Sequence, residues 1–196
     1  MAMDQATDPF ELFMLWFDEA STTEPNDANA MALATATTSG VPSVRIVLLK
    51  AIDRHGCTFY TNIESRKSHE LASNPLASLC FHWKSRRRQI RIEGKVMPVT
   101  EAGADAYFST RARASRIGAW ASDQSRPLES RAVLEQRFGD YAARFPGEDV
   151  PRPPHWSGWR LVPERFEFWQ DGPFRLHDRI VFSAEDDGWS RQLLYP

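Results

Sequence analysis

Cysteine is scarce in this sequence, with only Cys57 and Cys80 among 196 residues. Each lies in its own apolar segment, and neither belongs to a C-x-x-C motif. This usage excludes a disulfide-stabilised secreted scaffold, because such scaffolds are rich in paired cysteines. We therefore expect both side chains to be buried, reduced thiols.

Long apolar runs are also missing. No stretch approaches the roughly 20 apolar residues that a helix needs to cross a membrane. The first residues, Met1 to Gln5, lack the basic and apolar regions of a secretory signal peptide. The sequence therefore predicts a cytoplasmic protein without a membrane partner.

The common catalytic and nucleotide-binding motifs are absent. The sequence contains no G-x-G-x-x-G, Walker loop, H-E-x-x-H or G-x-S-x-G. The histidines, at positions 55, 69, 82, 155 and 177, show no ligand spacing, so we predict no metal site. The net charge of -2 gives no general electrostatic basis for binding nucleic acid. Any basic feature must therefore be a local site.

Aromatic residues, by contrast, are plentiful, with 7 Trp, 12 Phe and 4 Tyr. A core and a subunit interface explain most of them, and a flat ligand would explain a few. The chain length suits one domain over residues 1–196, with residues 1–8 as a disordered N-terminal tail.

Periodicity in the sequence predicts short strands with helices grouped between them. Asp8-Pro9 is typical of a helix start, and apolar residues recur at helical spacing after it. The predicted helices cover residues 9–20, 66–73, 100–111, 113–120 and 127–145, the last with a buried stripe of Leu134, Phe138, Tyr141 and Phe145. The predicted strands cover residues 31–37, 43–50, 57–62, 76–83, 88–96, 159–169, 175–182 and 189–195. Consecutive strands favour a mainly β, antiparallel barrel with peripheral helices (α+β) over a doubly wound sheet.

Three candidate anion receptors lie beside these strands. The first is Ser65-Arg66-Lys67, where a helix start offers free N–H groups and a partial positive charge. Two cations oppose the helix dipole there unless an anion binds, although solvated charges in a first turn explain them as well. Arg45 and Lys50 add cations to a strand, but a regular strand points them to opposite faces. Only a strand-end effect or a second subunit lets both serve one ligand.

The second receptor is Tyr107, Arg111 and Ser115, spaced i, i+4 and i+8. If one helix runs through, a phenol, a guanidinium and a hydroxyl line one face. Such a face suits a phosphate, because arginine binds two oxygens and the hydroxyls donate to others. A solvated helix face is the plainer explanation of this segment taken alone.

The third receptor is Arg175-Leu176-His177-Asp178-Arg179. On a strand, Arg175, His177 and Arg179 share one face, and Leu176 takes the other. That face is either a binding surface or an exposed polar strand face, and the residues themselves leave both open.

Together with several short motifs, these segments resemble the pyridoxamine 5'-phosphate oxidase family from about Asp8 to Pro196. Each motif alone is weak, but their order and spacing are specific. The motifs that carry the resemblance are Arg45-Ile46-Val47-Leu48-Leu49-Lys50, Phe59-Tyr60-Thr61-Asn62, Ser65-Arg66-Lys67, Gln89, Tyr107-Phe108-Ser109, Ile117-Gly118-Ala119-Trp120, Gln124-Ser125, Phe168-Trp169-Gln170 and Arg175-Leu176-His177-Asp178-Arg179.

The resemblance implies an FMN-binding split β-barrel that forms a homodimer, with FMN in a cleft between the subunits. The positions that match FMN contacts are Arg45, Ile46, Val47, Leu48, Leu49, Lys50, Tyr60, Thr61, Arg66, Lys67, Gln89, Gln124, Ser125, Trp169 and Arg179. The positions that match substrate contacts are Lys50, Tyr107, Arg111, Ser115, Arg175 and His177, and the last two are the implied catalytic residues. Arg66 and Lys67 suit the FMN phosphate, and Tyr107, Arg111 and Ser115 suit the phosphate of the substrate.

The activity that the resemblance implies is oxidation of C4' of pyridoxamine or pyridoxine 5'-phosphate to the aldehyde of pyridoxal 5'-phosphate. Dioxygen is the implied acceptor and hydrogen peroxide the by-product. Two features depart from the family pattern. Only seven residues precede Asp8, where the family has a basic segment that helps to cover the substrate. The chain ends Leu193-Leu194-Tyr195-Pro196, where the family has Arg-Leu-x-Pro.

Two alternatives stay open. A related split-barrel flavin oxidase of the phenazine-biosynthesis type would act on another substrate, but it has no need of Tyr107, Arg111 and Ser115 as a phosphate receptor. A non-catalytic flavin-binding protein would have no use for Arg175 and His177.

Overall fold

The computed structural model describes residues 3–196. The helices are α1 (Pro9–Ser21), α2 (Arg66–Ser73), α3 (Glu101–Ser109), α4 (Arg113–Ala121) and α5 (Arg131–Arg144), with 3-10 turns at Met3–Gln5, Lys84–Arg86 and Pro173–Arg175. The strands are β1 (Ala30–Ala36), β2 (Pro42–Leu48), β3 (Ala51–Asp53), β4 (Gly56–Asn62), β5 (Leu76–Trp83), β6 (Arg88–Pro98), β7 (Trp156–Gln170), β8 (Asp178–Glu185) and β9 (Gly188–Leu193). Within residues 3–196, none of the helices is long and apolar enough to span a bilayer.

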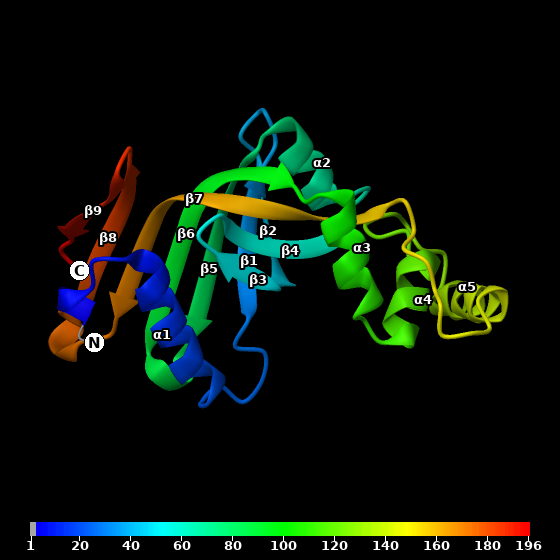
Figure 1. Ribbon diagram of the computed structural model, residues 1–196, viewed down its shortest axis with the longest axis horizontal. Coiled ribbons are helices and arrows are strands. Elements are labelled where there is room, and N and C mark those ends of the chain that lie inside the picture. The colour runs from blue at the N-terminus through cyan, green and yellow to red at the C-terminus, as the bar shows by residue number, and fades with distance from the viewer. Residues whose placement is uncertain (1–2) are drawn as a thin grey trace.

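The strands form one antiparallel sheet in the order β2-β1-β5-β6-β7-β4-β3, with β8 and β9 added beside β7. Strand β7 is long enough to pair with β6 along one edge and with two strands along the other. Its first part, Trp156 to Leu161, pairs with β4, and its second part, Arg165 to Gln170, pairs with β8. The sheet therefore divides along β7 into two wings (Figure 1). This architecture confirms the mainly β, antiparallel split barrel with peripheral helices.

Helix α1 covers one face of the sheet and seals the core. Asp8 caps it by accepting hydrogen bonds from backbone N–H groups of the first turn, as the Asp8-Pro9 sequence predicts. Phe13 packs edge-on against Phe81, and Trp16 packs edge-on against Phe168, with centroid distances of 5.2 and 5.4 Å. Edge-to-face contacts of this kind stabilise aromatic cores beyond the area that they bury.

The N-terminal segment is ordered in part. We expected residues 1–8 to be a disordered tail, but Met3–Gln5 forms a 3-10 turn and Ala6 is fully buried in the core. Met1 and Ala2 lie outside the described residues.

The two cysteines are free thiols, with Cys57 buried and Cys80 partly buried. The prediction of reduced thiols is therefore confirmed, and that of burial is confirmed for Cys57. Burial raises the pKa of both, so each stays protonated near neutral pH.

The helical segment between β6 and β7 differs from its prediction. Helix α3 ends at Ser109, because Thr110 and Arg111 donate backbone hydrogen bonds three residues back and tighten its last turn. No single helix therefore carries residues 107, 111 and 115. Helix α5 begins only at Arg131, after the capping residue Ser130, in place of the predicted start at residue 127.

The predicted buried stripe on α5 is wrong for this chain. None of the residues of α5 is buried, and Phe138 is 38% exposed. The reason is that α5 packs chiefly on α4 and lies away from the core (Figure 1).

The predicted strand 175–182 is also wrong at its start. Strand β8 begins at Asp178, and Pro173–Arg175 forms a 3-10 turn in which Phe174 and Arg175 have φ values of 58° and 64°. Gly172 permits this turn, because a Cβ there would lie 2.2 Å from the Leu176 carbonyl oxygen. Arg175 and His177 thus precede β8 and do not share a strand face with Arg179.

Candidate active site

A cavity of about 1070 Å³ opens between strand β2, the end of β4, helix α2 and the segment from α3 to α4. The predicted site residues that line it are Arg45, Ile46, Val47, Leu48, Lys50, Tyr60, Thr61, Arg66, Lys67, Tyr107, Arg111, Ser115, Gln124 and Ser125. The tertiary structure thus brings the first and second predicted anion receptors into one space.

The other predicted site residues do not line this cavity; they are Leu49, Gln89, Trp169, Arg175, His177 and Arg179. Leu49 packs into the core, because the strand ends there and its side chain turns inward. The rest gather around the start of β8, where Trp169 pairs with Gln89 on one side and Arg179 on the other. Helix α2 and strand β8 lie on different wings of the sheet (Figure 1), so one chain divides the predicted site into two groups.

Arg45 and Lys50 both line the cavity despite their different strand parity. Strand β2 ends at Leu48, so Lys50 lies beyond the regular strand and is free of its alternation. The Lys50 backbone N–H donates to the carbonyl oxygen of Thr58 at 2.9 Å, which fixes this turn against β4. The cavity wall includes every residue from Val44 to Leu48, so it follows β2 at the edge of the sheet and is not restricted to one strand face.

Lys67, at the start of α2, is a buried cation with neutral partners. Its Nζ lies 3.0 Å from the hydroxyls of Thr61 and Ser65 and 2.9 Å from the amide oxygen of Gln124. Burial and the nearby Arg45 guanidinium lower the pKa of Lys67 to about 8. The Ser65 hydroxyl binds Lys67 and does not cap the helix. An anion at this helix start would meet free N–H groups and a cation that has no countercharge.

Arg111 is the centre of the second receptor. Its guanidinium lies over the Trp156 ring at 4.9 Å, and Tyr60 stacks on Trp156 at 5.3 Å and on Tyr107 at 4.2 Å. Burial lowers the pKa of Arg111, and its Nη1 is buried without a hydrogen-bond partner within residues 3–196. Of the two buried side-chain donors without a partner within residues 3–196, Arg111 Nη1 and Arg116 Nε, only the first belongs to a residue that lines the cavity, where an acceptor on a ligand could pair with it.

Trp156 is a cavity residue that the sequence analysis missed. It follows a proline-rich connector, and its position gives no motif. Only the β4–β7 register, which pairs Asn62 with Trp156 and Tyr60 with Gly158, places the indole beside the Tyr60 ring. A signal for such a residue would be an aromatic side chain at the first position of a strand that pairs with a site strand.

The neighbouring arginines of α4, Arg113 and Arg116, contact the end of α5 and the segment after it and do not line the cavity. Arg113 donates from Nε to the carbonyl oxygen of Gly147 at 2.9 Å and also contacts the carbonyls that end α5. Arg116 lies 3.9 Å from a carboxylate oxygen of Glu148. Both therefore hold α4 to the segment after α5, and of the arginines near this helix only Arg111 lines the cavity.

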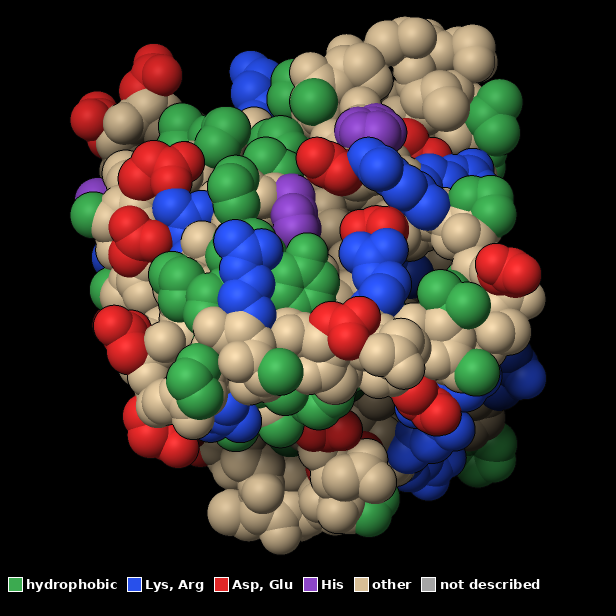
Figure 2. Space-filling model, turned by 90° about the vertical axis from the view of Figure 1, so that its right-hand side faces the viewer, with side chains coloured by type: hydrophobic (Ala, Val, Ile, Leu, Met, Phe, Trp, Pro, Cys, Tyr) green, Lys and Arg blue, Asp and Glu red, His purple; other side chains and the backbone are tan. Residues whose placement is uncertain are grey.

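The surface around this part of the molecule carries both signs of charge. Figure 2 shows acidic and basic side chains interspersed over the end that carries α4 and α5. The gathering of cations in the cavity is thus local, because the chain as a whole has a net charge of -2 and no excess of basic residues.

The second group of residues is organised around Trp169 and Glu167. The His177 ring lies 4.7 Å from that of Trp169, and its Nδ1 lies 3.1 Å from a carboxylate oxygen of Asp171. Arg179 donates from Nε and Nη2 to one carboxylate oxygen of Glu167, at 3.0 and 2.6 Å.

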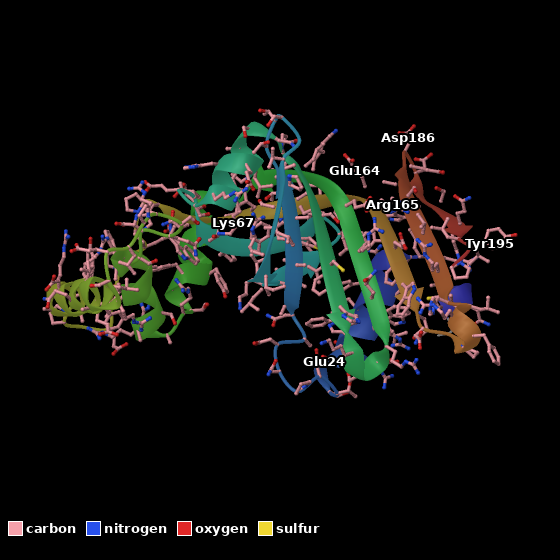
Figure 3. All side chains as sticks on the ribbon, turned by 180° about the vertical axis from the view of Figure 1, so that it is seen from behind. Glu24, Lys67, Glu164, Arg165, Asp186 and Tyr195 are labelled. Atoms are coloured by element: carbon pink, nitrogen blue, oxygen red, sulfur yellow. The ribbon has the colours of Figure 1, made fainter. Side chains whose placement is uncertain are left out.

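The C-terminus is tied to this second group. Arg179 donates from Nη1 to the carbonyl oxygen of Tyr195 at 2.9 Å. Figure 3 shows Tyr195 at one end of the molecule and Lys67 beside α2, well away from it. Within one chain, the second group therefore does not reach the cavity.

Two family models match this chain. The model described as pyridoxamine 5'-phosphate oxidase matches residues 17–145, which is more than half of the sequence. This chain belongs to the pyridoxamine 5'-phosphate oxidase family. A second model, the pyridoxine 5'-phosphate oxidase C-terminal dimerisation region, matches residues 156–196.

Relatives support the family membership over the whole chain. The chain is 62% identical to the pyridoxine/pyridoxamine 5'-phosphate oxidase of Sphingopyxis alaskensis, over 100% of this chain and 91% of that protein. It is 60% identical to the enzyme of the same name from Rhodospirillum rubrum, over 96% of each chain.

Solved structures agree with the fold. PhzG from Burkholderia lata, in complex with tetrahydrophenazine-1-carboxylic acid, superposes with a TM-score of 0.92 at 33% identity, covering 98% of this chain and 95% of that one. A pyridoxamine 5'-phosphate oxidase-related, FMN-binding protein from Nostoc punctiforme has a TM-score of 0.77 at 16% identity, covering 98% and 100%, which supports the fold alone.

The family match also bears on assembly. Residues 156–196, matched to the dimerisation region, include β7, β8 and β9 and all of the second group except Gln89. The match points to a homodimer.

Proposed function

We propose that this protein is an FMN-dependent oxidase that converts pyridoxamine 5'-phosphate or pyridoxine 5'-phosphate to pyridoxal 5'-phosphate. The observation that carries the proposal is the presence of two separate cation groups, around Lys67 and around Arg111, in one cavity. A phosphorylated cofactor and a phosphorylated substrate would use one group each. The high identity to enzymes of this name over the full chain supports the same conclusion.

The residues around α2 fit the phosphate end of FMN. Lys67 and Arg66 stand at the helix start, Arg45 reaches it from β2, and Lys67 has only neutral partners in the structure. Such a site stabilises a dianion through charge-assisted hydrogen bonds. The cavity, at about 1070 Å³, is at the upper end of the usual range for small-molecule sites, which suits a cofactor and a substrate together.

The residues of the second receptor fit the 5'-phosphate of the substrate. Arg111 offers two donor nitrogens to phosphate oxygens, and the hydroxyls of Tyr107 and Ser115 donate to others. The stacked Trp156 ring holds the guanidinium without neutralising it, so its charge stays available to the ligand.

Bound FMN would supply the acceptor for the hydride that leaves C4', and dioxygen would take up the electrons as hydrogen peroxide. The task of the chain is to orient C4' for that transfer. We assign this task to the partner subunit's Arg175 and the partner subunit's His177, which clamp the ring in a homodimer. Gln89, Trp169 and Arg179 would reach FMN in the same manner.

A related oxidase with a phenazine-type substrate is the second candidate, because the PhzG structure superposes closely. Arg111 does not separate the two candidates, because the carboxylate of such a substrate accepts hydrogen bonds from a guanidinium as a phosphate does. The identity to the pyridoxine/pyridoxamine 5'-phosphate oxidases, 60 to 62% against 33% for PhzG, favours the first candidate.

The decisive experiment is a turnover assay on FMN-loaded protein with pyridoxamine 5'-phosphate and pyridoxine 5'-phosphate, following peroxide and the aldehyde. Turnover of either, with unphosphorylated pyridoxamine a much poorer substrate, is the expected result. Bound flavin without turnover of either compound would overturn the proposed activity and leave the fold assignment intact.

A further inference from the structure

Glu70 is a buried carboxylate below the cation cluster of α2. Its side chain is only 5% exposed, and it does not line the cavity. The Ser43 and Thr35 hydroxyls, from β2 and β1, both donate to its Oε2 at 2.5 Å. Arg66 donates from Nε to its Oε1 at 2.8 Å, one helical turn away. Glu70 therefore joins two strands and a helix at one point.

The carboxylate is held in its charged form. Burial by itself would raise the pKa of Glu70, but hydrogen bonds from Ser43, Thr35 and Arg66 outweigh it and hold the pKa at about 2. A negative charge is therefore present under the cavity near neutral pH.

Two cavity cations are anchored at this point. The Nε of Arg66 is engaged by Glu70, which leaves its two terminal nitrogens available to a ligand. Arg45 lies with Nη2 3.4 Å from the same carboxylate, and its Nη1 donates to the hydroxyl of Thr35 at 2.6 Å. Arg66 thus has one part fixed to the Glu70 cluster and lines the cavity with the other. Both terminal nitrogens of Arg45 are bound, Nη1 by the Leu33 carbonyl oxygen and Thr35 and Nη2 by Ser43 and Glu70, so the cluster fixes its whole head in the cavity wall.

The charges at this end of the cavity balance a phosphate monoester. Arg45, Arg66 and Lys67 supply three positive charges, and Glu70 removes one of them. The difference, 3 − 1 = 2, matches a phosphate that carries between about 1.5 and 2 negative charges near neutral pH.

We propose that Glu70 is a positioning residue that fixes Arg45 and Arg66 in the receptor for the FMN phosphate. This inference rests on the proposed function, because it takes FMN as the occupant of this end of the cavity. It goes beyond that proposal in assigning the selectivity for a phosphorylated flavin to a carboxylate that does not itself contact the ligand.

The test compares FMN with riboflavin, which lacks the phosphate, by fluorescence titration of the apoprotein. In Glu70→Gln the Kd for FMN is expected to rise about tenfold, close to the loss of one charged hydrogen bond, while the Kd for riboflavin stays the same. The matched control is Glu135→Gln on α5, where Arg131 and Glu135 form the same i,i+4 contact at 2.8 Å on the surface. That control is expected to leave both dissociation constants unchanged.

Three results for Glu70→Gln would overturn the proposal. Equal weakening of FMN and riboflavin binding would indicate general damage to the fold, and tighter FMN binding would indicate that the Glu70 charge only repels the phosphate. An unchanged Kd for FMN would show that Glu70 has no part in the receptor. An apo wild-type protein that binds FMN no better than riboflavin would instead defeat the proposed function itself.

A double-mutant cycle provides the second measurement. In an Arg66→Gln background, Glu70→Gln should weaken FMN binding by clearly less than tenfold, and full additivity would overturn the role assigned through Arg66.

Discussion

Arg111 and Lys67 are both cavity-lining cations without a carboxylate partner within residues 3–196. Most surface cations in this chain differ from these two, because they form an ion pair with an acidic group, as Arg137 does with Asp123. Burying a charge without a countercharge costs free energy unless a ligand of opposite charge neutralises it. At the scale of residues, the cavity is therefore lined by cations that lack a countercharge, as the proposed binding of two phosphates requires.

Replacing Arg111 with alanine should raise the KM for pyridoxamine 5'-phosphate about 10- to 100-fold and leave kcat nearly unchanged. The reason is that Arg111 binds the non-reacting end of the substrate, and a hydrogen bond to a charged group contributes about 1.5–3 kcal/mol. Steady-state kinetics on FMN-saturated protein measure both constants. Arg144→Ala is the control, since Arg144 also lies over an aromatic ring, that of Trp120, but outside the cavity. An unchanged KM in the Arg111 variant would remove that residue from the site.

The lowered pKa of Lys67 predicts a pH dependence of FMN binding. Below about pH 8 Lys67 is charged and binds the phosphate; above it the side chain loses its proton, so binding must take a proton up and affinity falls. The decrease should be about fivefold between pH 8 and 9 and approach tenfold per pH unit above pH 9, measured by titration of the apoprotein. Lys67→Met should bind FMN more weakly and lose this dependence. A slope that persists in Lys67→Met would assign it to another group.

At the scale of elements, β7 decides how the molecule is divided, because it changes partner from β4 to β8 along one edge. The change occurs opposite an irregularity in the β6–β7 ladder at Glu93 and Gly94. Bulges bend a strand and increase its twist, which lets the two wings of the sheet diverge. A Cβ at Gly94 would lie 2.0 Å from the Val162 carbonyl oxygen, so only glycine fits there.

Gly94→Ala should therefore lower the free energy of unfolding by at least about 1–3 kcal/mol, because the new Cβ clashes with backbone atoms that no side-chain movement can relieve. Gly139→Ala is the contrasting control. Gly139 lies inside α5 with nothing within 4 Å of its Cβ position, and alanine should raise stability there by about 0.5–1 kcal/mol. Urea unfolding followed by circular dichroism measures both. Equal stability of Gly94→Ala and wild type would show that β6 and β7 can separate at this point.

The turn before β8 is the second element with a functional consequence. Arg175→Ala should leave the Kd for FMN unchanged and slow turnover by about 10²-fold, since its proposed role is to orient C4'. Alanine retains a Cβ, so the left-handed backbone at Arg175 (φ 64°) is strained to the same degree in both proteins. Flavin titration and turnover assays separate the two effects. Equal turnover in the variant would exclude Arg175 from catalysis.

At the scale of the whole molecule, the residues predicted for the site fall into two separate groups in one chain. The cavity group lies on the wing with α2, and the group around Trp169 and His177 lies on the wing with β8 (Figure 1). In the proposed enzyme, a symmetric dimer that places one wing against the other would create two identical sites, each with residues from both copies.

Subunit mixing tests this arrangement. Arg111→Ala and Arg175→Ala homodimers should each be impaired at low substrate concentration. Unfolding and refolding them together at equal amounts should restore about one quarter of wild-type activity, because half of the dimers are mixed and one site in each mixed dimer is intact. Mixing without refolding is the control. No recovery in refolded mixtures that contain mixed dimers would place both residues in the same subunit's site.

The sequence by itself determined the elements and the chemistry of the receptors. The periodicity of apolar residues and the helix-capping residues located α1, α2 and most strands, because local contacts decide those features. The ordered motifs identified the family, which the family models confirm. The cations of the cavity were also predictable, since charged residues within apolar segments are conspicuous in a sequence.

Only the tertiary structure decided which of these residues meet. Trp156 reaches Arg111 through the β4–β7 register, and Glu70 reaches Arg45 by packing α2 on β1 and β2. The separation of Arg175 and His177 from the cavity follows from the change of partners along β7. Long-range pairing and tight turns set these relations, and neither leaves a periodic signal in the sequence. The condition attached to Tyr107, Arg111 and Ser115, that one helix runs through them, is not met: the break after Ser109 places Tyr107 and Arg111 in the cavity by turn geometry and not by helical spacing.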